Sequence, residues 1–247
     1  MDTFSQTHGQ ADGGTEPRGY TAPRSEAEVA VEIERRKSRF LAVLTRAQTA
    51  DQAQNHLETL RRRHHEARHH CSAWVIGPQR DIRRSQDDGE PSGTAGAPML
   101  EALTHATMPD GAQDLSDVVV VVVRWFGGTL LGAGGLVSAY SDATAAVVAE
   151  AAAGGHLVRR RQLRRHTVLA PVAEVGRWEN ELRGQGIAVD DTDYTCPETL
   201  SGQPAARLHL ATADTGEDSA RLTALLASLS SGTATPQAGD TFWTQAS

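Results

Sequence analysis

Six consecutive valines, Val118 to Val123, constrain the fold of this chain more than any other segment. Valine is β-branched and favours extended backbone, in which successive side chains point to opposite faces. A strand made only of valine is therefore apolar on both faces, and each face must be covered by another layer of the protein. The run is far shorter than the roughly 18 apolar residues of a membrane-spanning helix. It predicts a central strand of a sheet and no membrane span.

The segments around this strand have the patterns of further strands and helices. Short apolar segments predict strands at residues 29–33, 40–44 and 71–76. Thr49 and Gln52 form a capping box at the start of an amphipathic helix. A short helix is expected at residues 99–103, and a long helix over residues 136–151 ends at the glycine pair 154–155.

Beyond residue 160 the pattern restarts in the order strand, helix, strand, strand, helix, strand. The strands are expected at residues 166–169, 187–193, 206–211 and 240–244, and the helices at residues 172–182 and 222–229. This βαββαβ order is the ferredoxin-like arrangement. We therefore predict an α+β protein with two domains, residues 25–158 and 159–247. Residues 1–24, rich in Gly, Thr, Ser, Gln and Pro, are expected to be a disordered tail.

The charge balance limits the partners of the chain. The formal net charge of −7 and the pI of 5.8 argue against broad, nonspecific wrapping of nucleic acid. Runs of arginine are usually solvated, yet they are also the only plausible contacts for RNA phosphate. These runs are Arg61–Arg63 and Arg159–Arg165, and the RNA contacts that we expect are Arg159, Arg160 and Arg161.

The sequence predicts a cytoplasmic location. No basic, apolar and small-residue series of a secretory signal opens the chain. The two cysteines, Cys71 and Cys196, lie far apart and make no disulfide framework.

Two glycine-rich polar blocks flank the valine strand and form the candidate site. The first block runs from Asp87 to Gly96 (DDGEPSGTAG), and the second from Arg124 to Gly135 (RWFGGTLLGAGG). Small residues let the backbone approach a bound group closely, and charged side chains fix the polarity of that group. The candidate binding residues are Asp87, Asp88, Gly89, Glu90, Ser92, Gly93, Thr94, Arg124, Phe126, Gly127, Gly128, Gly132, Gly134, Gly135 and Tyr140.

Each block has a second interpretation. The carboxylates of the first block could bind a divalent cation, or the block could be a turn in which Ser92 and Thr94 cap a helix that starts near Pro98. The second block lies at a strand-to-helix junction, which favours anions, and Arg124 could add a bidentate contact. Alternatively, its glycines merely permit tight packing of a helix on the sheet. Lys37 is the only lysine, so neither block is a Walker-type phosphate loop.

We expect neither a metal nor a cofactor. His69, His70 and Cys71 lie along the entry to a strand, where alternate side chains face opposite ways and cannot all converge on one ion. No G-x-S-x-G elbow surrounds Ser92 or Ser141, so a serine hydrolase is not indicated.

These motifs resemble those of the YigZ/IMPACT family. The resemblance covers about residues 30–150 and is carried by Lys37-Ser38-Arg39-Phe40, by DDGEPSGTAG, by Pro98-Met99-Leu100 and by RWFGGTLLGAGGLVSAY, which ends at Tyr140. It implies that the N-terminal domain is similar in fold to the second domain of small-subunit ribosomal protein five. The bacterial members also have a ferredoxin-like domain that resembles the last domain of elongation factor G.

The resemblance also implies a function. The eukaryotic relative restrains a starvation-responsive translation-initiation kinase by occupying its activator. For bacterial members the resemblance implies a translation-linked or nucleic-acid-linked role without an established reaction. Ser138 stands where the family usually has an arginine, so an anion site here would be weaker or would use Arg124 alone.

Two hypotheses follow for the function. In the first, the protein is a noncatalytic regulator that binds a protein or ribonucleoprotein of the translation apparatus through the two blocks. In the second, it is an enzyme acting on a small phosphorylated or acidic ligand between them. We favour the first, because no nucleophile–base pair is recognisable. We also expect Arg124 to pair internally with one of the carboxylates of Asp87, Asp88 and Glu90.

Overall fold

The computed structural model describes residues 19–246, which form two compact units. The N-terminal unit comprises Gly19–Arg160 together with residues 245–246, and the C-terminal unit comprises Arg161–Thr244. No helix of the described residues is both long enough and apolar enough to span a bilayer.

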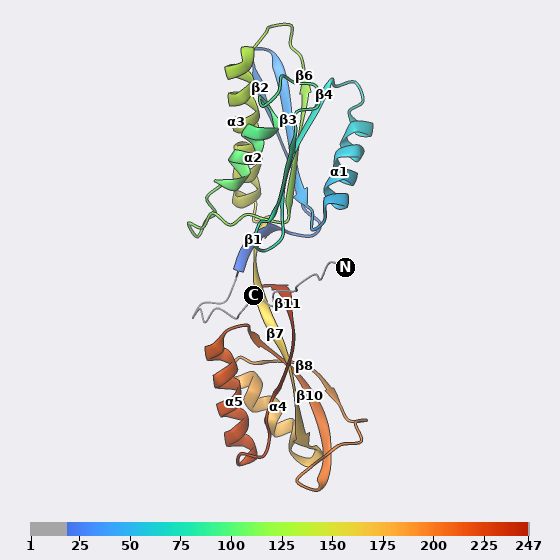
Figure 1. Ribbon diagram of the computed structural model, residues 1–247, viewed down its shortest axis with the longest axis vertical. Helices are drawn as coiled ribbons and strands as arrows, with labels where there is room; N and C mark the ends of the chain where they lie inside the picture. The colour runs from blue at the N-terminus through green and yellow to red at the C-terminus, as the bar shows by residue number, and fades with distance from the viewer. Residues whose placement is uncertain (1–18, 247) are drawn as a thin grey trace, which may run out of the picture. The chain divides into compact units, whose positions relative to one another are not determined.

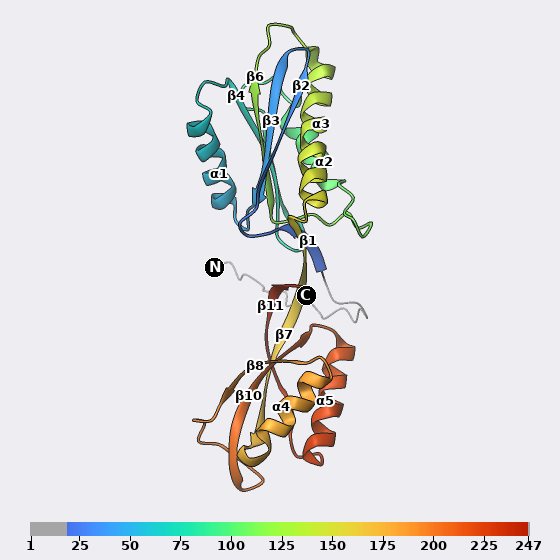
Figure 2. The same cartoon turned by 180° about the vertical axis from the view of Figure 1, so that it is seen from behind.

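The N-terminal unit has an antiparallel five-stranded sheet between two layers of helices (Figures 1 and 2). Its strand order is β2 (Glu28–Arg35), β3 (Ser38–Arg46), β6 (Val118–Trp125), β4 (His69–Ile76) and β5 (Ile82–Gln86). Helix α1 (Ala50–Arg63) covers one face. Helices α2 (Gly96–Thr104) and α3 (Gly132–Ala153) cover the other.

The valine strand β6 lies at the centre of this sheet, as predicted. All six valines are fully buried. Val118, Val120 and Val122 belong to the core beneath α2 and α3, whereas Val119, Val121 and Val123 belong to the core beneath α1. The lack of a polar residue in the run is thus explained by two apolar layers, one on each side.

The expected tail at residues 1–24 is wrong at its C-terminal end. Residues 1–18 lie outside the described part of the chain, but Gly19–Pro23 form strand β1. The side chain of Tyr20 is buried, and its hydroxyl donates to Asp117 Oδ2 over 2.6 Å. Thr21 makes a parallel bridge with Leu115. A composition typical of disorder was outweighed here by one buried aromatic side chain with a carboxylate partner.

The C-terminal unit has the predicted βαββαβ order, with one additional short strand. Its elements are β7 (Leu157–Pro171, which begins in the N-terminal unit), α4 (Val175–Gly184), β8 (Ala188–Asp193), β9 (Thr199–Leu200), β10 (Gln203–Ala213), α5 (Gly216–Ser230) and β11 (Gln237–Gln245). The strand order is β11, β7, β10, β8, with β10 antiparallel to both neighbours.

The core of this unit lies between the sheet and its two helices. Trp178 and Leu182 of α4 and Leu222 and Leu226 of α5 are buried against the apolar side chains of β7 and β10. Val172, expected on the apolar stripe of the first helix, is instead 43% exposed in a 3-10 turn before α4.

Replacement of Tyr20 by Phe should lower stability in a pH-dependent way. Burial, followed by the hydrogen bond to Asp117, raises the pKa of Tyr20 to about 12, whereas the unfolded value is about 10. The stabilisation is therefore complete below pH 10 and is lost as the pH rises through 12. Urea unfolding of the parent and of Tyr20→Phe should differ by roughly 2 kcal/mol at pH 8. The difference should shrink above pH 10, and a constant difference would contradict the assignment.

Candidate functional site

The two glycine-rich blocks meet at a buried ion pair between Arg124 and Glu90. Arg124 ends the valine strand, and its Nη1 donates to Glu90 Oε1 over 2.6 Å. The two side chains are only 7% and 3% exposed. Of the three carboxylates of the first block, Glu90 alone pairs with this guanidinium among the described residues.

Aromatic side chains enclose the ion pair. The hydroxyl of Tyr140 donates to the same oxygen of Glu90 over 2.7 Å. The guanidinium of Arg124 lies 5.4 Å from the ring centre of Phe40 and 5.8 Å from that of Phe126. The rings of Phe40 and Tyr140 meet edge to face at 5.3 Å. Glu90 therefore accepts from two donors in a largely apolar environment.

Neither of the two nucleophilic side chains beside the pair ionises readily. Cys71 Sγ lies 3.0 Å from the carbonyl oxygen of Asp87 and 3.3 Å from the hydroxyl of Tyr140. Burial is the main cause that raises the pKa of both Cys71 and Tyr140 far above their ordinary values. Both remain protonated near neutral pH and act as hydrogen-bonding groups of the core.

Asp87 caps helix α2. Its carboxylate accepts from the backbone N–H groups of Gly93, Ala95 and Gly96 over 2.8, 3.1 and 2.7 Å. Burial opposes its ionisation, but these three donors outweigh burial and hold the pKa of Asp87 below its usual value. The alternative in which Ser92 and Thr94 cap the helix is wrong. The hydroxyl of Thr94 donates to the carbonyl of Pro91, and the cap is a carboxylate outside the helix.

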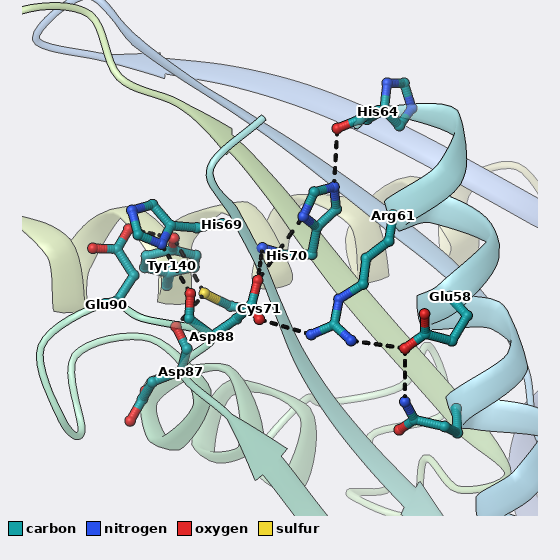
Figure 3. Close-up of polar contacts among 11 residues, drawn as sticks. Glu58, Arg61, His64, His69, His70, Cys71, Asp87, Asp88, Glu90 and Tyr140 are labelled. Atoms are coloured by element: carbon teal, nitrogen blue, oxygen red, sulfur yellow. Dashed lines mark hydrogen bonds and ion pairs between the residues drawn. The ribbon is translucent and has the colours of Figure 1, made fainter. Parts of the chain in front are cut away.

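Asp88 points towards α1 and away from Arg124. Figure 3 shows its carboxylate between His70 and Arg61. Oδ1 accepts from Arg61 Nη2 and Oδ2 from the backbone N–H of His70, each over 2.7 Å. The two blocks thus come together at Glu90 and Arg124 and diverge at Asp88, so a single groove lined by all three carboxylates does not form.

The histidines of β4 have separate partners. His69 Nδ1 lies 2.9 Å from the carbonyl oxygen of Asp88, and His70 Nε2 lies 3.1 Å from the carbonyl oxygen of His64 (Figure 3). Burial is the main cause that lowers the pKa of His70. Within residues 19–246, no three His, Cys, Asp or Glu side chains are grouped so that they could hold a metal ion.

The second block packs against the hairpin turn between β2 and β3. The backbone N–H of Gly127 donates to Ser38 Oγ over 3.2 Å. A Cβ atom at position 127 would lie only 1.9 Å from the carbonyl oxygen of Lys37. Arg36 Nη1 donates to the carbonyl of Leu130 over 3.3 Å. The tight-packing interpretation therefore applies to Gly127, but its neighbour is a turn and not a helix.

The other glycines of the block have different roles. Gly128 and Gly132 have φ angles of +83° and +75°, which other residues rarely adopt. Gly134 would have open space for a side chain, and a Cβ at Gly135 would meet only the side chain of Leu131.

Large apolar side chains of this block and of the adjoining first turns of α3 face solvent. Leu130 is 81% exposed, Phe126 46% and Val137 39%. We did not single out Leu130 and Val137 from the sequence, although Leu130 lies in the loop before α3 and Val137 lies outside the buried stripe of that helix. Ser138, at the position of the expected arginine, lies 3.3 Å from Asp142 on the exposed surface of α3.

The remaining candidate residues divide by burial. Gly89, Ser92 and Gly93 are exposed, whereas Thr94 and Tyr140 are buried. Of the arginines considered for RNA, Arg159 pairs with Asp114 and lies 3.7 Å from Asp110, so carboxylates compensate its charge.

Removal of the Arg124 side chain should strongly destabilise the protein. Arg124→Ala leaves the Glu90 carboxylate buried without its cation, which typically costs about 3–5 kcal/mol. The matched control is Arg63→Ala, which removes an exposed ion pair with Glu28 and should cost under about 1 kcal/mol. Thermal unfolding measures both. A fall in Tm of less than about 2 °C for Arg124→Ala would refute the buried pair, because 3 kcal/mol should shift Tm several degrees further.

A methyl group at position 127 should be poorly tolerated. Gly127→Ala places Cβ against the backbone of Lys37, so the turn or the loop must move, and we expect a loss of more than about 2 kcal/mol. Gly134→Ala is the control, since it meets no atom within 4 Å and lies in α3. Alanine there should raise stability by up to about 1 kcal/mol. Equal effects of the two substitutions in urea unfolding would contradict this account.

Known proteins of the IMPACT family are similar to this chain over the region that contains these motifs. The family model of the Impact N-terminal domain matches residues 36–148. The IMPACT family member YvyE of Bacillus subtilis (strain 168) is 40% identical over 164 residues, which cover 66% of this chain and 70% of that protein. The IMPACT family member YigZ of Escherichia coli (strain K12) is 46% identical over 116 residues, covering 46% of this chain and 53% of that protein.

A solved structure, described only as that of a hypothetical protein, is 31% identical with a TM-score of 0.55. The match covers 90% of this chain and 98% of that one. The family model matches residues 36–148, and the identity to YvyE extends over 70% of that protein. The chain therefore belongs to the IMPACT family.

Proposed function

We propose that this protein is a noncatalytic, cytoplasmic regulator that binds a protein or ribonucleoprotein of the translation apparatus through its second glycine-rich block. Membership of the IMPACT family supports the link to translation. The observation that carries the binding surface is the exposure of Leu130 and Phe126 on a loop fixed to a neighbouring turn.

Exposed apolar side chains on a rigid loop favour protein recognition. Soluble domains rarely leave large apolar residues clustered at the surface without a binding role. The loop is held by the Gly127–Ser38 hydrogen bond and by the Arg36–Leu130 hydrogen bond. Because the loop is already ordered, binding needs little further loss of conformational entropy.

The first block acts as a support in this proposal. The carboxylates of Asp87, Asp88 and Glu90 already bind an N-terminus of a helix, an arginine of α1 and an arginine of β6. We therefore propose that the partner contacts a subset of the candidate residues. These are Phe126, Gly127, Gly128, Gly132, Gly134 and Gly135, joined by Leu130.

Two finer parts of the proposal concern the domains. We propose that the two units are similar to the second domain of ribosomal protein five and to the last domain of elongation factor G, with a boundary near residue 159. The βαββαβ order of the C-terminal unit supports the second similarity. An RNA contact through Arg159, Arg160 and Arg161 is a lesser part, because carboxylates compensate Arg159.

Binding to a reconstituted set of purified ribosomes, ribosomal subunits and translation factors tests the function. The full chain should associate with at least one component in cosedimentation or gel filtration. Leu130→Asp should weaken that association at least tenfold, because it places a charge in the apolar contact. Val172→Asp changes an equally apolar residue in the C-terminal unit, 43% exposed, and should stay within twofold of the parent.

Two results would contradict the proposal. The parent chain associates with none of the components, or Leu130→Asp binds as well as the parent does. Discrete binding of a small phosphorylated metabolite that displaces Glu90 from Arg124 would favour the enzyme hypothesis instead.

A further inference from the structure

The hairpin turn beside the second block is unusual in its backbone and its charge. Arg36 and Lys37 form the two-residue turn between β2 and β3 and have φ angles of 48° and 67°. Turns of this kind favour Asn-Gly, because left-handed backbone is unfavourable for other residues. Strained backbone that presents particular side chains often marks a functional position. Here it presents two cations.

These two cations have no carboxylate partner within residues 19–246. The neighbouring Arg35 pairs with Asp142, and Arg39 pairs with Glu32. Arg36 instead donates to the carbonyl of Leu130, and the ammonium of Lys37 has no hydrogen bond or ion pair within the described residues. Both side chains are exposed. Their charges are therefore available to a partner.

The cations and the exposed apolar side chains form one surface. Gly127 packs against the carbonyl of Lys37, and the loop that follows carries Leu130 next to Arg36. We propose that this tip surface, made of Arg36, Lys37, Phe126 and Leu130, docks an acidic amphipathic protein segment. The carboxylates of that segment meet the two cations and its apolar side chains cover Leu130 and Phe126. The inference rests on the proposed function and specifies the chemistry of the partner.

The same surface fits RNA less well. Binding of RNA relies on many phosphate contacts and on aromatic side chains that stack on successive bases. Within the described residues, the tip surface has two cations without carboxylate partners and one aromatic ring, and Leu130 is aliphatic.

Lys37 is the only lysine of the chain, so a crosslink from a lysine side chain of this protein can come only from this position. A carbodiimide activates a carboxylate, which the amine then attacks to form an amide, and the reagent leaves as a urea, so no spacer is added. Applied to the complex of the full chain with the translation component that it binds, the reagent should couple Lys37 to an Asp or Glu of a protein. Lys37→Arg retains the charge, so it should bind within twofold of the parent but lose this crosslink. The crosslink is mapped by mass spectrometry, and Lys37→Arg identifies any product of the N-terminal amine.

Charge reversal measures the contribution of the cations. The double variant Arg36→Glu/Lys37→Glu should bind at least tenfold more weakly than the parent. Arg84→Glu, an exposed arginine of β5 in the same unit, should stay within twofold. Unfolding curves that match the parent show that the variants are folded.

The outcomes separate the inference from the proposed function. The inference of an acidic partner is contradicted if the double variant binds as well as the parent, or if the parent binds without forming a crosslink from Lys37. Either result leaves the proposed link to translation intact. Equal binding to protein-free ribosomal RNA and to the intact component also overturns it, because the ligand is then a polyphosphate. Failure of the parent chain to bind any component contradicts the proposed function itself.

Discussion

The buried ion pair of Arg124 and Glu90 is the interaction on which the arrangement of the N-terminal unit depends. A charged arginine at the end of an apolar central strand would be very unfavourable without a counter-charge. Glu90 supplies that charge from a loop 34 positions away in the sequence. Tyr140 adds a second donor, and the rings of Phe40 and Phe126 lie 5.4 and 5.8 Å from the guanidinium. The acidic loop is consequently fixed to the central strand and to α3.

The other two carboxylates of the same loop bind the helices on the two faces of the sheet. Asp87 binds the first N–H groups of α2. Asp88 crosses to the opposite side of the sheet and binds Arg61 of α1. One short loop therefore holds the helices of both layers to the strands between them. The three carboxylates of the loop therefore have structural partners, and the partner surface that we propose lies on the second block.

Most of the strands and helices could be predicted from the sequence, but few of the hydrogen-bond partners of the charged side chains could. The valine run predicted the central strand because burial on both faces leaves a local signal. Strand β5 left no such signal, since all of its side chains are exposed. One interpretation of the first block had Ser92 and Thr94 cap the helix, whereas the actual cap comes from Asp87. Local patterns record burial, but which carboxylate meets which donor is decided by how the loop crosses the sheet.

The contact between Gly127 and the turn at Lys37 has a consequence for how this family can vary. The backbone of Gly127 lies directly against the carbonyl of Lys37, and its N–H donates to Ser38 Oγ, so little space is left between the two loops to absorb a change in spacing. Insertions are usually tolerated in surface loops because loop closure depends only weakly on length. An added residue in the turn between β2 and β3 would instead displace the carbonyl that Gly127 abuts. The lengths of these two loops are thus coupled, and a change in one is compatible with the fold only together with a change in the other.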